Sequence, residues 1–228
     1  MYRVRPSHEE PKLSEIALPP IAFMGLVSGT ISVDSFLSAG LGVRTACAEN
    51  GLLGAGARFL DVGCGCGRVA RTLIQDPIGA YVGFDRHWPM ISWARREIAS
   101  ADPRFQFDHF AVTSHYDHID GVEGTVDVKE FRWPYEDNSF DSVLLASVFS
   151  HMPMDEIRVY MRQIHRVLAP GGKVFASYLL KHQVEAEMEG FNYLFDPEEI
   201  ETMLREELFE ARFVEETSQA WWVATPIK

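Results

Sequence analysis

The sequence has few cysteines, and this limits the kinds of site and compartment that it fits. Cys47, Cys64 and Cys66 are the three cysteines among 228 residues. Three thiols do not make a disulfide framework, and no second Cys/His pair stands at zinc-like spacing from Cys64 and Cys66. We therefore expect no metal site. Reduced thiols favour a cytoplasmic location.

Long apolar runs and positive charge are also scarce. The charged N-terminus lacks an apolar stretch of signal-peptide length, and the run at residues 21–27 is interrupted by Gly25 and too short to cross a bilayer. We therefore expect no membrane partner. Lysine and arginine number 21 against 33 aspartates and glutamates, for a net charge of −12. Because the electrostatic field of this negative charge repels a phosphate backbone on average, we expect no nucleic-acid partner.

The sequence does contain enough apolar residues to form the core of one α/β domain, with 46% hydrophobic residues. Residues 1–20 hold four prolines and show no periodicity, which predicts an extended arm. Residues 32–50 predict one or two helices that begin after Ser32 and stop at Gly51. We therefore divide the chain into an N-terminal arm and helical cap, residues 1–50, and one globular unit, residues 51–228. The sequence leaves the oligomeric state open.

From residue 57 onward, strand-like and helix-like segments alternate. Strands are expected at residues 57–62, 80–85, 104–109, 143–146, 173–180, 211–215 and 220–225, and helices at residues 69–74, 89–100, 155–168 and 197–208. The sequence Pro-Gly-Gly at residues 170–172 is expected to stop the third of these helices. This order predicts a mostly parallel seven-stranded sheet with helices on both faces and a terminal antiparallel strand.

A glycine-rich loop, with the sequence DVGCGCGR from Asp61, directly follows the first of these strands. Gly63 and Gly65 allow a tight turn and remove Cβ atoms that would block a ligand from the backbone. We expect the next helix to start near Gly67 or Arg68, with its free N–H groups facing the loop. Asp61 suits a cationic amino-acid ligand better than a pyrophosphate. The alternative is a glycine-rich turn without a ligand.

Asp85 ends the second predicted strand and is the second candidate binding residue. In nucleoside-binding α/β domains, an acidic residue at this place accepts hydrogen bonds from ribose hydroxyls. The alternative is an aspartate that caps a helix or faces solvent.

Three segments together resemble the class I S-adenosylmethionine-dependent methyltransferases, which have a Rossmann-like fold. They are FLDVGCGCGRVAR, GFDRHWPMISWARREI and the long stretch that includes SVFSHM, and the resemblance covers about residues 25–182. It is greatest to the bacterial small-molecule branch. It implies S-adenosylmethionine as cofactor, S-adenosylhomocysteine as product, and a small-molecule acceptor that is methylated on oxygen or nitrogen.

The resemblance also assigns roles to residues of the first two segments. It implies that Asp61 and the backbone of Gly63, Cys64, Gly65 and Gly67 hold the methionine moiety. It further implies that Asp85 holds the ribose and that Arg86 borders it.

The adenine end departs from the family pattern. The family usually has an aspartate just after the third strand, where this chain has Ala111. Adenine would then contact backbone groups near Val112, or it would contact Asp108 if the alignment with the family pattern is shifted. We expect Trp133 to pack against the sheet, the alternative being that it stacks on adenine.

The exit of the fourth expected strand contains Ser147 and His151. The resemblance places Ser147 beside the methionine end of the cofactor. Since the residue before Pro153 avoids helical dihedrals, we expect residues 147–151 to form a loop over the carboxyl edge of the sheet. His151 could accept a proton from the acceptor there, or it could cap a helix or pack.

The acceptor pocket is expected to form from residues 1–50 and about 181–196. In the second stretch Phe191, Asn192, Tyr193 and Phe195 form an aromatic lid or, equally, a packing cluster. On the last strand, one of the adjacent residues Trp221 and Trp222 should face the core and the other the surface.

Two other functions remain open. An NAD-dependent oxidoreductase is disfavoured by the glycine spacing and by the lack of a Tyr-x-x-x-Lys pair. A non-catalytic nucleoside-binding or partner protein on the same fold stays an alternative, because methyl transfer requires no obligatory catalytic residue.

Overall fold

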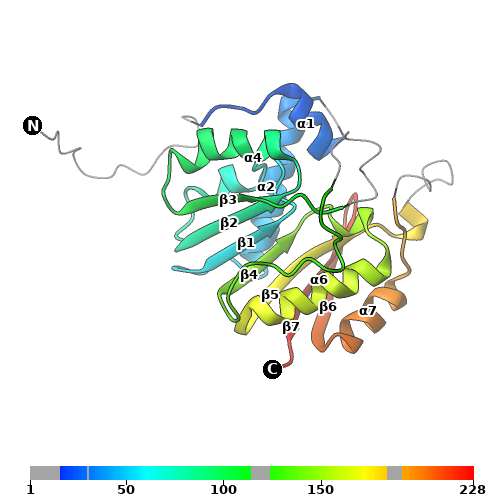
Figure 1. Cartoon of the computed structure of the whole chain (residues 1–228). Helices are drawn as coiled ribbons and strands as arrows, with labels where there is room; N and C mark the ends of the chain where they lie inside the picture. The colour runs from blue at the N-terminus through cyan, green and yellow to red at the C-terminus, as the bar shows by residue number, and fades with distance from the viewer. Residues whose placement is uncertain (1–15, 30, 114–123, 184–191) are drawn as a thin grey trace, which may run out of the picture.

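The computed structural model describes residues 16–29, 31–113, 124–183 and 192–228, which form one seven-stranded sheet flanked by helices (Figure 1). The strands are β1 (Arg58–Val62), β2 (Ala80–Asp85), β3 (Phe105–His109), β4 (Phe140–Leu145), β5 (Leu168–Tyr178), β6 (Phe209–Glu216) and β7 (Ala220–Pro226). The α-helices are α1 (Ile21–Ser28), α2 (Val33–Glu49), α3 (Ala70–Leu73), α4 (Trp88–Ala94), α6 (Met154–Val167) and α7 (Pro197–Glu206). A π-helical turn η2 (Arg95–Ala99) continues α4, and η3 (Phe149–His151) and η4 (Lys181–Gln183) are short 3-10 helices.

The strand order is β3-β2-β1-β4-β5-β7-β6, which confirms the predicted sheet. Neighbouring strands from β3 to β5 pair in parallel, whereas β7 pairs antiparallel with both β5 and β6. The chain builds outward from β1 through β2 to β3 and then crosses to β4 on the other side of β1. This crossing makes the carboxyl edge between β1 and β4 a topological switch point, where open parallel sheets bind ligands.

Helices cover both faces of the sheet, as expected (Figure 1). One buried cluster joins α6 and α7 to the sheet, with Ile157, Met161 and Ile164 among its members. The other joins α2, α3 and α4 to the opposite face. A strand with side chains covered on both faces must be apolar throughout, as β4 is over residues 143–145.

The expectation that one of the two adjacent tryptophans of β7 is exposed was wrong. Trp221 is 8% exposed and Trp222 is 2% exposed. They do point to opposite faces, since Trp221 stacks on Phe175 and Trp222 meets Tyr178 edge-on. Both are buried because β7 lies inside the sheet, between β5 and β6, where each face is covered.

Helix α6 ends before the Pro-Gly-Gly sequence that was expected to stop it. Its C-cap Leu168 is already extended and pairs with Phe140 on β4. Residues 170–172 therefore lie within β5, where the register shifts before Lys173 pairs with Ser142. The Pro-Gly-Gly sequence forms an irregularity in a strand, so β5 starts five residues earlier than residue 173.

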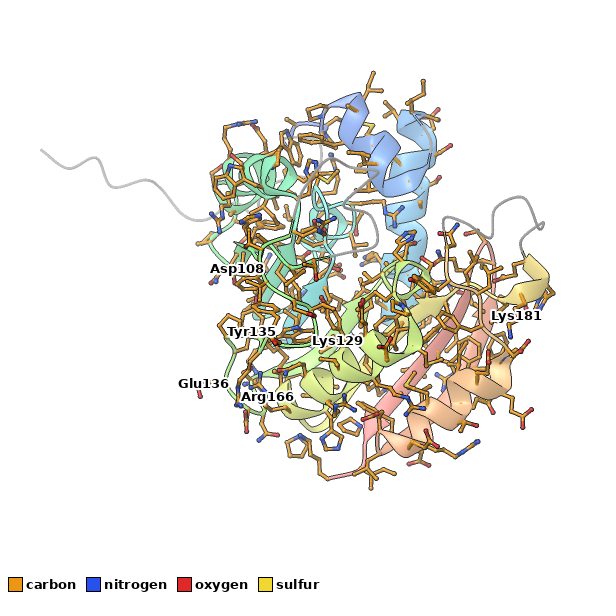
Figure 2. All side chains as sticks on the ribbon, turned by 45° about the vertical axis from the view of Figure 1, so that its right-hand side comes forward. Asp108, Lys129, Tyr135, Glu136, Arg166 and Lys181 are labelled. Carbon is orange, nitrogen blue, oxygen red and sulfur yellow. The ribbon has the colours of Figure 1, made fainter. Side chains whose placement is uncertain are left out.

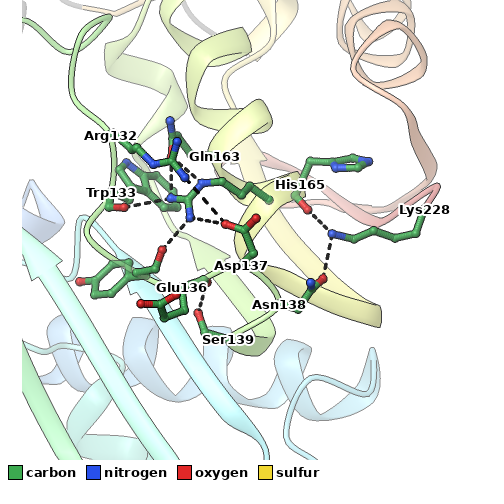
Figure 3. A network of polar contacts seen from close by, with 11 residues as sticks. Arg132, Trp133, Glu136, Asp137, Asn138, Ser139, Gln163, His165 and Lys228 are labelled. Atoms are coloured by element: carbon green, nitrogen blue, oxygen red, sulfur yellow. Dashed lines mark hydrogen bonds and ion pairs between the residues drawn. The ribbon is translucent and has the colours of Figure 1, made fainter.

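One arginine of α6 fixes the segment that leads into β4. Arg166 donates hydrogen bonds to the backbone oxygens of Trp133 and Tyr135 and pairs with Asp137, in the network that Figure 3 shows. Trp133 is buried and meets Phe84 and Tyr160 edge-on. Its packing role is thus confirmed.

The N-terminal region contains a helix, α1, that the sequence reading did not predict. Its C-cap Gly29 is left-handed, and its N–H donates to the oxygen of Gly25. The predicted start of α2 is confirmed, since the Ser32 hydroxyl accepts a hydrogen bond from the N–H of Ser35. Most of the expected extended arm lies outside the described residues. Among the described residues, no single helix is long and apolar enough to cross a membrane, although the bent pair α1 and α2 together reaches that length and composition.

Candidate functional site

A pocket of about 260 Å³ lies at the carboxyl ends of β1, β2 and β4, at the switch point of the sheet. The strand ends contribute Asp61, Asp85 and Ala146, and the segments that follow them supply most of the remaining wall. Nine of the ten predicted site residues line it: Asp61, Gly63, Cys64, Gly65, Asp85, Arg86, Val112, Ser147 and His151. Residues far apart in the sequence therefore meet here because parallel strands end at one edge.

The glycine loop packs against the end of β2, the end of α1 and the exit of β4. The N–H groups of Gly63 and Cys64 both donate to the oxygen of Phe84. Gly63 has φ 69° and Gly65 has φ 54°, which are left-handed values that favour glycine. The tight turn that the sequence predicted is confirmed.

Glycine at these two positions also permits close contact with neighbouring side chains. A Cβ atom on Gly63 would stand 2.6 Å from Cγ2 of Val148, and one on Gly65 would stand 2.6 Å from Cγ1 of Val27. Both valines line the pocket, so a side chain on either glycine would crowd the pocket wall. The glycines therefore let the loop pack closely against α1 and the exit of β4.

Gly67 is the predicted site residue that does not line the pocket. Its N–H donates to the oxygen of Cys64, and a Cβ there would meet Ile98, behind the loop. The following helix also starts later than expected, at Ala70 with Val69 as N-cap. Gly67 thus shapes the turn from outside the pocket.

Asp85 is held in place by two backbone N–H groups. Its Oδ2 accepts from Gly65 and its Oδ1 accepts from His87, both at 2.8 Å. A carboxylate offers about four lone pairs, so acceptor capacity is left for a ligand hydroxyl. The two roles predicted for Asp85, a ligand contact and a structural hydrogen-bond acceptor, are therefore compatible. Its carboxylate braces the loop and also lines the pocket.

Asp61 is a buried carboxyl group at the bottom of the pocket. It is 2% exposed and accepts a hydrogen bond of 2.6 Å from the hydroxyl of Tyr81. Burial raises the pKa of Asp61 to about 7, although the Tyr81 hydrogen bond and the charge of Arg68 oppose this rise. A ligand ammonium group would stabilise the charged carboxylate, so Asp61 fits the amino-acid end of the cofactor.

Arg68 was not singled out from the sequence, although it ends the glycine motif. It lines the pocket and donates to the oxygen of Val27 and the hydroxyl of Ser28 at the end of α1. Burial lowers the pKa of Arg68, and the nearby carboxyl of Asp61 opposes this. Arg68 thus joins the glycine loop to the cap helix, a contact that no local sequence pattern indicates.

Burial disfavours the thiolate form of the two cysteines in the loop. Burial raises the pKa of Cys66 to about 12 and raises that of Cys64 well above its usual value. Among the described residues, no group of three or more His, Cys, Asp or Glu side chains is placed to hold a metal ion.

At the expected adenine end, Val112 lines the pocket, and its oxygen accepts a hydrogen bond from Nε of Arg86. Asp108, the alternative contact, does not line it. Asp108 accepts a hydrogen bond from the hydroxyl of Tyr135, and the two side chains lie side by side in Figure 2. Of the two expected contacts, the geometry therefore favours the backbone near Val112.

The exit of β4 forms the loop that the sequence predicted. Ser147 is left-handed with φ 64°, η3 follows, and α6 begins at Met154 after Pro153. Ser147 and His151 both line the pocket. His151 thus lies at the same pocket as Asp61, as expected from its position.

Two walls of the pocket were not predicted from the sequence. Leu26 and Val27 come from α1, a helix that was not predicted, and Glu156 and Tyr160 come from one face of α6. The four-residue spacing of Glu156 and Tyr160 was the available signal, but it equally fits a helix that packs on the sheet.

The aromatic lid is not present in the described residues. Phe195 is buried edge-on to Tyr178, and the N–H of Tyr193 donates to the oxygen of Ser150. Neither residue, nor Asn192, lines the pocket, so the packing alternative holds for Tyr193 and Phe195. Phe191 lies outside the described residues.

Comparison with known proteins agrees with this geometry. The family described as a methyltransferase domain matches residues 60–176, just over half of the chain. A cycloartenol-C-24-methyltransferase of Oryza sativa is 27% identical over 64% of this chain and 34% of its own length. Methyltransferase GfsG of Streptomyces halstedii is 29% identical over 63% of this chain and 45% of its own length. The chain thus spans less than half the length of these two relatives.

Solved structures share the fold. Magnesium protoporphyrin IX methyltransferase of Synechocystis, with bound S-adenosylhomocysteine, has a TM-score of 0.61 and 17% identity, over 87% of this chain and 90% of its own. CalS10, an amino pentose methyltransferase of Micromonospora echinaspora with bound S-adenosylmethionine, has a TM-score of 0.60 and 16% identity, over 84% and 92%. The family match contains the glycine loop, Asp85 and His151. This chain therefore belongs to the methyltransferase domain family, among the class I S-adenosylmethionine-dependent methyltransferases.

Proposed function

We propose that this protein transfers the methyl group of S-adenosylmethionine to an oxygen or nitrogen atom of a small-molecule acceptor. The observation that carries the proposal is that Asp61, Asp85 and His151 line one pocket at the switch point of the sheet. Asp61 and Asp85 come from the ends of β1 and β2, His151 from η3 beyond β4, and each offers a group suited to a different part of the reaction.

The cofactor would be held along the carboxyl edge. Asp61 and the backbone of Gly63, Cys64 and Gly65 bind the methionine moiety, and Asp85 accepts hydrogen bonds from the ribose hydroxyls. Arg86 borders the ribose, and the backbone near Val112 contacts the adenine. Gly67 contributes only the shape of the turn, and Ser147 lies near the sulfur.

When bound, S-adenosylmethionine supplies an electrophilic methyl group on a cationic sulfur. The protein's residues align the acceptor and keep water out, for which Leu26, Val148 and Met152 provide apolar walls. His151 accepts the proton of an acceptor hydroxyl or ammonium on an imidazole nitrogen. Since the reaction reduces positive charge at sulfur, alignment matters more than a charged stabiliser.

A small-molecule acceptor is supported by the size of the pocket and by the charge of the protein. The pocket is about 260 Å³, and the net charge of −12 disfavours nucleic acid. CalS10 is an amino pentose methyltransferase, which is one example of such chemistry on this fold. We place the N-terminal cap, residues 1–50, in the acceptor site because α1 contributes Leu26 and Val27 to the wall. Free buried thiols support a cytoplasmic location.

Calorimetry followed by a transfer assay tests the proposal. S-adenosylhomocysteine should bind and NAD should not, which separates this function from an oxidoreductase. Methyl-labelled cofactor incubated with an extract of small metabolites should then give labelled products. Cofactor binding without labelled products from any extract would favour the non-catalytic alternative, and absence of S-adenosylhomocysteine binding would overturn the proposal.

A further inference from the structure

The tip of the hairpin between β6 and β7 reaches the exit of β4 through one side chain. The side-chain oxygen of Gln219 accepts hydrogen bonds from the hydroxyl of Ser177 at 2.6 Å and from that of Ser147 at 3.1 Å. Its amide nitrogen lies 3.5 Å from the hydroxyl of Ser150. Two serine hydroxyls thus use the same amide oxygen, and Ser177 and Ser150 are both fully buried.

The network also reaches the backbone at the bend. The hydroxyl oxygen of Ser177 accepts a hydrogen bond of 2.8 Å from the N–H of Ser147. Ser147 has φ 64°, a left-handed conformation that a residue with a side chain keeps only when its surroundings hold it. The Ser177 hydroxyl also lies 3.5 Å from the oxygen of Leu145, but Gln219 is the nearer acceptor at 2.6 Å. With its proton on Gln219, the Ser177 oxygen is oriented to accept from Ser147.

The bend at Ser147 sets the wall of the pocket. The next residue, Val148, lies against Gly63 of the glycine loop, and its oxygen accepts the N–H of His151. Ser147, Val148 and His151 all line the pocket. A change in the backbone at Ser147 would therefore move the glycine-loop contact and the imidazole together.

We propose that Gln219 is a positioning residue, which holds Ser147 in its left-handed conformation and so places Val148 and His151 at the reaction site. Gln219 does not itself line the pocket. Its role in the reaction rests on the proposed function, whereas its effect on the pocket wall does not.

The test compares three variants of the full chain. Gln219→Met keeps the length of the side chain but removes the acceptor oxygen. Gln219→Glu keeps an oxygen for both serine hydroxyls. Thr217→Val is the matched control at the same hairpin tip, because the Thr217 hydroxyl donates to the backbone oxygen of Gln219 and not to its side chain. The readouts are the amide resonances of Gly63 and His151, the imidazole resonances of His151, and the affinity for S-adenosylhomocysteine.

We expect Gln219→Met to shift or broaden the Gly63 and His151 resonances and to weaken S-adenosylhomocysteine binding about fivefold, as for loss of one hydrogen bond. Gln219→Glu should restore both readouts, and Thr217→Val should leave both as in the parent. A Gln219→Met protein with a lower melting temperature but unchanged resonances and affinity would reduce Gln219 to a structural residue and overturn the inference. Failure of the parent protein to bind S-adenosylhomocysteine would instead overturn the proposed function.

Discussion

Val148 occupies the space in which a side chain on Gly63 would begin, since its Cγ2 atom would stand 2.6 Å from a Cβ there. Gly63 also has φ 69°. The glycine loop and the exit of β4 therefore depend on each other directly, and a substitution at Gly63 acts on both.

Gly63→Ala should destabilise the fold and weaken cofactor binding. The left-handed backbone alone costs an L-residue roughly 1–2 kcal/mol, and the new methyl group must also displace Val148. Thermal unfolding and S-adenosylhomocysteine calorimetry measure the two effects. Adding Val148→Ala should recover part of the loss by removing the clash but not the strain.

Gly42→Ala is the matched control for Gly63→Ala. Gly42 lies within α2, and a Cβ there would meet nothing within 4 Å. It should bind S-adenosylhomocysteine normally and be stabilised by about 0.5–1 kcal/mol, because alanine favours a helix. If Gly63→Ala behaves like this control, Val148 and the loop are not coupled as described.

Asp85→Ala should weaken S-adenosylhomocysteine binding by about 1.5–3 kcal/mol, the range for hydrogen bonds to a charged group. The variant removes the acceptor for the ribose and the bonds that brace Gly65 and His87. Asp108→Asn is the control at the end of the neighbouring strand, since Asp108 does not line the pocket. Equal affinities of the two variants by calorimetry would make the role of Asp85 purely structural.

Asp61 should make cofactor binding depend on pH near neutrality. The folded pKa of about 7 lies above the ordinary value of 3.8, so the free folded protein retains a proton that the unfolded chain releases. The stability that this proton brings is complete below about pH 4 and is lost as the pH rises through about 7. The cationic ammonium group of S-adenosylhomocysteine favours the ionised carboxylate. The affinity for S-adenosylhomocysteine should therefore rise as the pH increases through about 7.

Calorimetry from about pH 6 to about pH 8 tests this behaviour. Asp61→Asn cannot ionise and should bind more weakly with little change in affinity across the range. A parent protein with pH-independent affinity, or an Asn variant with the same rise, would assign the titration to another group.

His151→Ala should lower the rate of methyl transfer by roughly 10²–10⁴ and leave S-adenosylhomocysteine affinity nearly unchanged, if its imidazole accepts the proton. His165→Ala is the control on α6, because His165 does not line the pocket and contacts the oxygen of Ile227. Single-turnover rates with an acceptor found by the labelling assay provide the measurement. A loss smaller than about tenfold would leave alignment and exclusion of water as the mechanism.

Local patterns in the sequence determined most secondary-structure elements and the polar end of the site. The spans of β2, α2 and α6, the tight glycine loop and the position of Asp85 at a strand end could all be predicted. Periodicity, capping and turn preferences act over a few residues, so they can be read without knowing the rest of the chain. Strand–helix alternation also predicted the mostly parallel sheet, whereas the strand order that makes the switch point came from the structure.

Only the tertiary structure decided which distant groups meet. The contacts of Val148 with Gly63, of Arg68 with Val27 and of Gln219 with Ser147 join segments that no local pattern relates. The burial of Trp222 likewise depended on β7 lying inside the sheet, and Pro-Gly-Gly joined β5 because Leu168 pairs with Phe140. Hydrophobicity and turn preference indicate the local conformation and the degree of burial that a residue favours. Which residue it contacts is decided by how the packed elements fit together.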